Sequence, residues 1–188
     1  MKTADKTITN AVVTALLVAA VVTTGCDESD SSVVQAMRFY RTEVILPDAM
    51  VAVKNGKVTH VPLPGTGTDC PVLVRYYGPD DCNECALSHM RENEELARWA
   101  AADKSFYLLI VMAPKDEDRN GTIERVKDMR SSLTVYFDES YYFESQKVIP
   151  QSDKMHTFLL GDDRKPKYIG NPLKNESSKK RFMKSLNN

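Results

Sequence analysis

The sequence predicts an α/β fold, a three-layer α/β/α sandwich with a mixed central sheet and an added helix and hairpin before it. Strand-like and helical patterns alternate from residue 71 to residue 137, which favours a partly parallel sheet covered by helices. Residues 106–113, FYLLIVMA, are almost continuously apolar, as is typical of a strand buried on both faces. Cys82 and Cys85 lie at the junction between one strand and the helix that follows it.

The expected elements follow one another in a regular order from residue 71 onward. We expect strands at 72–77, 106–113 and 133–137, helices at 83–102, 122–130 and 176–186, a short helical piece at 141–146, and a hairpin formed by 156–160 and 167–169. The strand at 106–113 is expected at the centre of the sheet. The charged segment 115–120 is expected to be a loop, with Asn120 or Thr122 capping the next helix. Four side chains near helical spacing are expected to face the core: Leu87, Met90, Leu96 and Trp99.

An N-terminal addition precedes this core. Residues 33–41 have helical spacing, and strand-like runs at 50–54 and 57–61 flank Asn55-Gly56. That dipeptide accepts the positive φ angles of a two-residue hairpin turn. We therefore assign residues 33–64 to the addition and residues 65–188 to the core domain.

The first 25 residues have the features of an export signal. Lys2 and Lys6 precede a mostly apolar stretch at 11–22, which is shorter than the about 20 apolar residues of a membrane span. The segment ends at Gly25-Cys26, and a small residue directly before a cysteine resembles a bacterial lipobox, in which the signal is cut before the cysteine and the cysteine is acylated. We predict a signal peptide at 1–25 and lipidation of Cys26, with an ordinary soluble secretory signal as the alternative.

An acidic tract, CDESDSS at 26–32, follows the predicted cleavage site and is expected to be a solvated tether. It resembles the acidic sorting signals of surface lipoproteins from Bacteroidetes-type bacteria, although short acidic runs are also ordinary linkers. The predicted location is the bacterial cell envelope, with the chain lipid-anchored to the outer membrane on its periplasmic or surface face.

Composition limits the classes of partner. The chain carries 25 basic and 26 acidic side chains, for a formal net charge of −1. Nucleic-acid binding needs a clustered excess of Lys and Arg, and the one basic run, Lys179-Lys180-Arg181, is expected to be a solvated face of the closing helix. We therefore expect no nucleic-acid partner.

The cysteines fit an exported chain, because disulfides persist in oxidising compartments. Cys82 and Cys85 are one helical turn apart, so they can close a small disulfide ring, and unpaired N–H groups at the start of a helix stabilise a thiolate at Cys82. Cys70, beside Pro71 at the start of a strand, is expected to be a small buried apolar side chain. The alternative is that Cys70 resolves or exchanges with the pair.

The order of elements over residues 71–186 resembles the thioredoxin fold with an N-terminal addition, as in the bacterial periplasmic thioredoxins that mature cytochromes. Residues 157–163, TFLLGDD, and 168–172, YIGNP, resemble a hairpin of thioredoxin-like lipoproteins from gut Bacteroidetes. The resemblance implies that Cys82 is the attacking thiol, that Cys85 is the resolving thiol, that protein thiols or disulfides are the substrates, and that no cofactor or metal is needed.

Three features depart from the thioredoxin pattern. Asn83 and Glu84 stand between the cysteines where Gly and Pro are usual, and no tryptophan precedes Cys82. Tyr76 stands where thioredoxins hold a buried aspartate for proton transfer. His156 stands where the resemblance places a cis-proline, and we expect a trans bond there because a cis bond before a non-proline residue costs about 2.5 to 4 kcal/mol.

The charges near Cys82 predict a thiol of ordinary acidity. The helix N-terminus favours the thiolate by about 0.3 to 1 kcal/mol, whereas Asp80, Asp81 and Glu84 each oppose it by roughly 0.5 kcal/mol. Without help from Arg75 or a histidine, we expect the Cys82 thiol to have a pKa of about 8.5. That value favours a reductant or a structural bridge over a strong oxidant.

These observations predict an exported, lipid-anchored protein that acts as a thiol–disulfide oxidoreductase through Cys82 and Cys85. One alternative is a non-catalytic surface or interaction lipoprotein in which the disulfide is structural. A second is a metal-binding protein in which Cys82, Cys85 and a histidine, His89 or His156, hold zinc or copper.

Overall fold

The computed structural model describes residues 32–63 and 70–187. The predicted signal peptide, the lipidation site Cys26 and nearly all of the acidic tether lie outside these residues. Residues 32–188 form one compact unit, which contains both the expected addition and the expected core. The predicted boundary near residue 64 falls in a segment that is not described, so the domain limits stay predictions. In the described part, no helix has the length and apolarity needed to cross a bilayer.

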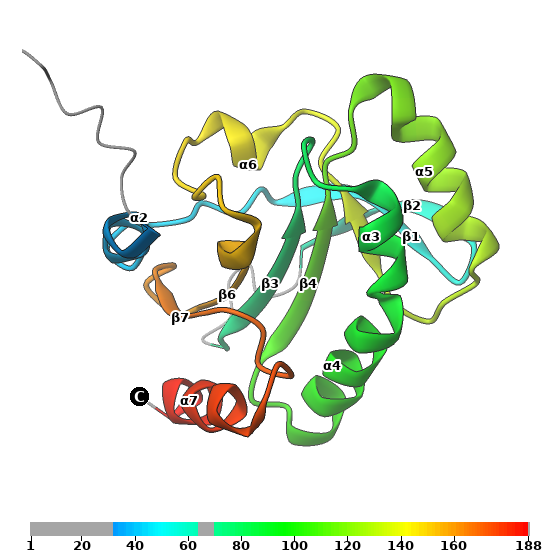
Figure 1. Cartoon of the computed structure of the whole chain (residues 1–188). Helices are drawn as coiled ribbons and strands as arrows, with labels where there is room; N and C mark the ends of the chain where they lie inside the picture. The colour runs from blue at the N-terminus through cyan, green and yellow to red at the C-terminus, as the bar shows by residue number, and fades with distance from the viewer. Residues whose placement is uncertain (1–31, 64–69, 188) are drawn as a thin grey trace, which may run out of the picture. The chain divides into compact units, whose positions relative to one another are not determined.

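A seven-stranded mixed sheet, ordered β2-β1-β5-β4-β3-β6-β7, forms the middle of this unit (Figure 1). Its strands are β1 (Ala49–Lys54), β2 (Lys57–Pro62), β3 (Val72–Tyr77), β4 (Tyr107–Met112), β5 (Val135–Phe137), β6 (Thr157–Leu160) and β7 (Pro166–Ile169). The three strands β3, β4 and β5 run parallel to one another, and every other pairing is antiparallel. β4 has three strands on each side, which confirms the predicted central position of the apolar run.

Helices cover both faces of the sheet. They are α2 (Ser32–Phe39), α3 (Asn83–Ser88), α4 (Met90–Asp103), α5 (Asp116–Asp128), α6 (Tyr142–Ser145) and α7 (Glu176–Leu186), together with a 3-10 turn, η1 (Asp153–Met155). Side chains of α3, α4, α5 and α7 pack against one face, where β3 contributes Leu73. Side chains of α2 and α6 pack against the other, where β3 contributes Val74. The predicted three-layer α/β/α sandwich with a mixed central sheet is therefore confirmed.

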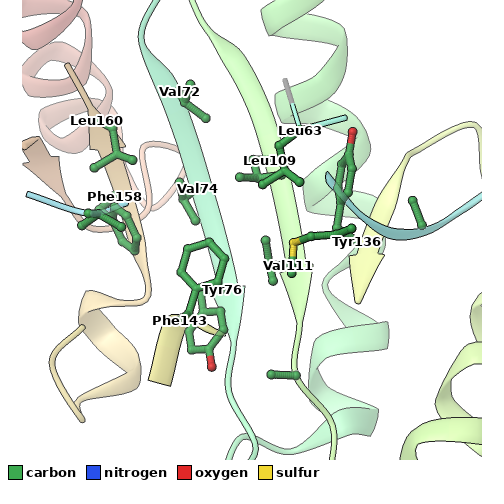
Figure 2. Close-up of a cluster of buried hydrophobic side chains, with 14 of the residues drawn as sticks. Leu63, Val72, Val74, Tyr76, Leu109, Val111, Tyr136, Phe143, Phe158 and Leu160 are labelled. Carbon is green, nitrogen blue, oxygen red and sulfur yellow. The ribbon is translucent and has the colours of Figure 1, made fainter. Parts of the chain in front are cut away.

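The core on the α2 and α6 face reaches from the middle of the sheet to the end of β3 (Figure 2). Val74 and Tyr76 point to this face because alternate residues of a strand share one side. The Tyr76 ring stacks on Phe143 of α6 with the ring centroids 5.4 Å apart, and Tyr76 is only 2% exposed. The end of β3 that leads to the cysteines is thus held by the apolar core.

The N-terminal hairpin forms as predicted. Asn55 and Gly56 have φ angles of 50° and 74°, the positive values that a two-residue turn requires, and Lys54 pairs with Lys57 across it. β1 then pairs antiparallel with β5, which places the hairpin at one edge of the sheet. The addition therefore extends the central sheet.

Two predicted helix boundaries are wrong. The helix expected at 83–102 is interrupted at His89, whose ψ of 0° separates α3 from α4. The Ser88 hydroxyl donates to the Cys85 carbonyl at 2.7 Å, a side-chain bond that competes with helical pairing. The segment 115–120 is largely helical, because α5 begins at Asp116 and carries three acidic residues in its first turn, where they interact favourably with the helix dipole.

The predicted apolar stripe of the interrupted helix is confirmed. Met90 and Leu96 are buried, and Leu87 and Trp99 are partly buried against the same face of the sheet. Trp99 packs edge to face with Phe182 of α7, with ring centroids 5.1 Å apart. These contacts hold α4 against the sheet.

Candidate functional site

A disulfide joins Cys82 and Cys85 where β3 passes into α3. Cys82 is the N-cap of α3, with an extended backbone, and its Sγ accepts the Cys85 backbone N–H at 3.2 Å. Both cysteines are exposed. The predicted pairing is present, and its first sulfur lies at the end of a helix where hydrogen-bond donors are available.

Cys70 is free and lies at the opposite end of β3. A strand of this length spans about 20 Å, so the Cys70 thiol is out of reach of the disulfide. Cys70 is half-buried beside a pocket of about 560 Å³ whose lining includes Phe106 and Tyr107. Burial and the negative charge of Asp162 raise the pKa of its thiol. These placements support the interpretation as an unreactive packed side chain and contradict the alternative of exchange with the pair.

A pocket of about 220 Å³ lies beside the disulfide. It brings together side chains from β3, from the start of α3 and from the segment before β6. The lining residues are Arg75, Tyr76, Tyr77, Asp81, Cys82, Cys85, Ala86, His89, Asp153, His156 and Thr157. The cysteines and both histidines named from the sequence therefore share one concavity.

His156 lies directly before β6 and is 9% exposed. Its Nδ1 is 3.0 Å from Asp81 Oδ2, and its Nε2 is 2.9 Å from the Pro150 carbonyl oxygen. The bond before His156 is trans, as expected, because all peptide bonds in the described residues are trans. Burial lowers the pKa of His156, but the hydrogen bond and the charge of Asp81 outweigh burial and raise it above its ordinary value.

Asp81 links this histidine to the chain just before Cys82. Its Oδ2 also accepts the Gly78 backbone N–H at 2.7 Å. Burial raises the pKa of this carboxyl, but the hydrogen bonds from His156 and Gly78 outweigh burial and lower it below its ordinary value. Asp81 is therefore a carboxylate that holds the turn leading into the disulfide.

Tyr76 is the buried group at the position that the resemblance assigns to an aspartate. Its hydroxyl donates to Glu144 Oε1 at 2.8 Å. Burial, followed by the hydrogen bond and charge of Glu144, raises the pKa of this phenol far above its ordinary value. Tyr76 is accordingly neutral, and it does not supply the carboxylate of the thioredoxin pattern.

Arg75 is a second buried cation on the pocket wall, and it is 6% exposed. Its Nη1 donates to Glu92 Oε2 at 2.8 Å, and the Asn171 side chain donates to the other oxygen of Glu92. Burial raises the pKa of Glu92, but the hydrogen bonds from Asn171 and Arg75 lower it overall. The charge of Arg75 is thus largely balanced by its own partner.

The acidic residues around Cys82 all have basic partners. Asp80 pairs with Lys115 at 3.1 Å and Glu84 pairs with Arg125, both from the α5 region, while Asp81 pairs with His156. Sequence reasoning counted the carboxylates but missed Lys115 and Arg125, because neither is near Cys82 along the chain. Since each acid is partly neutralised, the opposition to a Cys82 thiolate is weaker than the sequence indicated. The expected pKa near 8.5 stays a prediction.

The geometry does not favour the metal-binding alternative. Both ring nitrogens of His156 are engaged by Asp81 and Pro150. Across residues 32–63 and 70–187, no group of three or more His, Cys, Asp or Glu side chains is arranged to hold a metal ion.

Comparisons with solved structures include a likeness to a bacterial protein. No protein-family model matches the chain, and no curated protein matches its sequence. A crystal structure from Chlorobium tepidum, described as a candidate thiol:disulfide interchange protein DsbE, is 17% identical and covers 77% of this chain and 98% of its own, with a TM-score of 0.48. The likeness is one of chain path, and no residue role is taken from it.

Proposed function

We propose that this protein is an exported, lipid-anchored thiol–disulfide oxidoreductase. The observation that carries the proposal is an exposed disulfide at the start of α3, beside a pocket walled by partly buried charge pairs. Small disulfide rings at a helix N-terminus are suited to exchange because the departing thiolate is stabilised there.

Exchange proceeds through a mixed disulfide. In the reduced protein, the Cys82 thiolate attacks one sulfur of a substrate disulfide, forms an S–S bond to it and releases the other substrate sulfur as a thiolate. Cys85 then gives up its proton and attacks the Cys82 sulfur, which closes the ring and releases the second substrate thiolate. Two electrons pass to the substrate, and the ring seen here is the product. A dithiol donor must return two electrons to start the next cycle.

The backbone favours Cys82 over Cys85 for the first attack. Cys82 is the N-cap, and its sulfur already accepts the Cys85 backbone N–H. The same donor stabilises a thiolate when the ring is open. Cys85 lies inside the first turn, where its sulfur has only to reach Cys82.

Export and anchoring are supported by the sequence of the first 32 residues. A basic start, an apolar stretch and Gly25-Cys26 are followed by a short acidic tract. Mass spectrometry of the mature N-terminus, purified from an envelope fraction, tests this part. An acylated Cys26 is the expected result, and an intact Met1 or cleavage elsewhere contradicts it.

Trapping tests the activity. With Cys70→Ser in every variant, Cys85→Ser leaves Cys82 to hold a substrate in a mixed disulfide, whereas Cys82→Ser removes the attacking group and serves as the matched control. Partner thiols are expected to accumulate on the Cys85→Ser chain and to be released by dithiothreitol. Equal capture by both variants would contradict the assigned roles.

A structural disulfide in a non-catalytic module is the second candidate, and it is favoured by one observation. The neutral Tyr76 supplies no carboxylate to accept the Cys85 proton. The reduction potential of the pair separates the two candidates. A value between about −180 and −270 mV favours exchange, and a value well below about −300 mV favours a structural bridge.

A further inference from the structure

The two ring nitrogens of His156 both face oxygen atoms that only accept hydrogen bonds. Nδ1 meets a carboxylate oxygen of Asp81 at 3.0 Å, and Nε2 meets the backbone carbonyl of Pro150 at 2.9 Å. A neutral imidazole has one N–H and can satisfy only one of these contacts, whereas the imidazolium has two. The geometry therefore assigns the doubly protonated cation to His156.

We propose that the His156 imidazolium is the positioning residue of the Cys82–Cys85 pair. It fastens the segment 150–156 to the turn that leads into Cys82. The positioning role rests on the proposed exchange function. The charge state of His156 and its contacts with the turn are properties of the folded chain and do not depend on that function.

Contacts on both sides of the turn carry this proposal. Asp81 directly precedes Cys82, and its Oδ2 joins His156 Nδ1 to the Gly78 N–H. The backbone carbonyl of His156 accepts the Tyr76 N–H at 2.8 Å, at the end of β3. The turn between β3 and Cys82 is therefore held by His156 through its backbone on one side and through its side chain on the other.

The charges that face the pocket favour the cation. Asp81 is in direct contact with the His156 ring, and the charge of Glu144 in α6 also attracts this ring. Asp153 of η1 lines the same pocket. The other cation on the pocket wall, Arg75, is balanced by Glu92. The remaining titratable groups that line the pocket are Tyr76, Tyr77, His89 and the two cysteines. The raised pKa of His156 agrees with this balance.

Loss of the second ring proton removes one of the two hydrogen bonds that the His156 side chain donates. The neutral ring keeps a donor for either Asp81 or Pro150, so the other oxygen loses its partner. The segment 150–156 is then held to the turn by fewer contacts, and the disulfide is less well positioned for in-line attack. Sulfur exchange should therefore have a descending limb at high pH once the ionisation of the attacking thiol is accounted for.

The imidazole nitrogens provide the first test. Nitrogen-15 NMR of the oxidised protein measures both ring nitrogens of each histidine against pH, with the exposed His60 of β2 as the internal control. Both ring nitrogens of His156 are expected to carry protons at pH 7, and one of them is expected to lose its proton as the pH rises further. A His156 ring that carries only one proton at pH 7 would overturn the proposal.

The second test concerns the disulfide. The rate constant for reduction by dithiothreitol, calculated per dithiothreitol thiolate, is measured from pH 6 to pH 9 for the natural chain, His156→Gln and His60→Gln. The rate constants of the natural chain and of His60→Gln are expected to fall as pH rises. His156→Gln is expected to react roughly three- to tenfold more slowly at low pH, the factor that corresponds to one lost hydrogen bond, and to show no descending limb at high pH. Parallel profiles for all three proteins would overturn positioning, even if His156→Gln is less stable.

The natural chain keeps the test decisive if His156→Gln does not fold, because its own profile must show the descending limb at the pH where the NMR signals of His156 titrate. A limb that is absent or displaced overturns the proposal. These readouts use dithiothreitol, so they are separate from the trapping experiment. If trapping fails while His156 behaves as expected, the oxidoreductase function is contradicted, whereas the proposed contacts between His156 and the turn are not.

Discussion

A cysteine lies near each end of β3, and the two cysteines differ in burial and in the polar groups around their sulfur atoms. Cys70 is half-buried beside a largely apolar pocket, and burial raises the pKa of its thiol. Cys82 is an exposed helix N-cap whose sulfur accepts a backbone N–H, amid paired charges. Cys70 is thus placed as a packing group, whereas Cys82 lies where a backbone donor and paired charges can act on a thiolate.

The comparison also shows where polar groups are buried. At the Cys82 end, Arg75 and His156 lie below 10% exposure, each with a carboxylate partner. A buried ion pair adds little net stability, but the loss of one partner is costly. The charge pairs therefore make this end sensitive to single substitutions and to pH.

The largest expected effect is that of Asp81→Asn. This change removes the charged acceptor of the buried His156, and we expect the free energy of unfolding to fall by about 1 to 3 kcal/mol. Urea unfolding at pH 6 measures it. Asp80→Asn is the matched control, because the Asp80 side chain is 92% exposed and pairs with the exposed Lys115. Equal losses of unfolding free energy in Asp81→Asn and Asp80→Asn would show that the pair of Asp81 and His156 contributes no more than an exposed pair.

Alkylation tests the difference between the two thiols directly. In the reduced protein at pH 7, Cys82 is expected to react with iodoacetamide faster than Cys70, because burial raises the pKa of the Cys70 thiol and lowers its share of thiolate. Peptide mass spectrometry after short labelling distinguishes the sites. In the oxidised protein, Cys70 alone among Cys70, Cys82 and Cys85 should be labelled. Faster labelling of Cys70 in the reduced protein would reverse the comparison.

Stability should depend on pH at the Cys82 end. The folded pKa of His156 is raised, so its contribution is complete below its ordinary value of 6.5 and is lost as pH rises through the folded value. Asp81 has a lowered folded pKa, so its contribution is complete above its ordinary value of 3.8 and is lost as pH falls through the folded value. Unfolding midpoints should therefore decline on both sides, and His156→Gln should remove the decline at high pH. An unchanged alkaline limb in that variant would assign the decline to another group.

The smallest effect is expected at the exposed rim. Glu84→Gln breaks the pair with Arg125, and the free energy of unfolding should change by about 0 to 1 kcal/mol, less in high salt. Glu124→Gln, which breaks an exposed pair with Lys127 within α5, is the control. A loss above 2 kcal/mol would mean that Glu84 has a role beyond its surface pair.

Local patterns accounted for most of the fold. β3 and α7 have their predicted bounds, and the Asn55-Gly56 turn forms between its predicted strands, because periodicity and turn chemistry depend on neighbouring residues. The start of α5 was misjudged because a mixed-charge run is compatible with both a loop and a helical first turn. The break at His89 was missed because the feature that accompanies it is one hydrogen bond from the Ser88 hydroxyl, which leaves no mark on the helical periodicity of the sequence.

The sequence by itself determined that two cysteines one turn apart stand where a buried strand meets a helix. Only the tertiary structure decided what surrounds them. His156 reaches Asp81 across 75 residues and Glu144 reaches Tyr76 across 68, because β6 pairs antiparallel with β3 and α6 packs against the end of β3. Such contacts depend on strand order and register, which involve the whole chain, whereas a helix cap depends on a few adjacent residues.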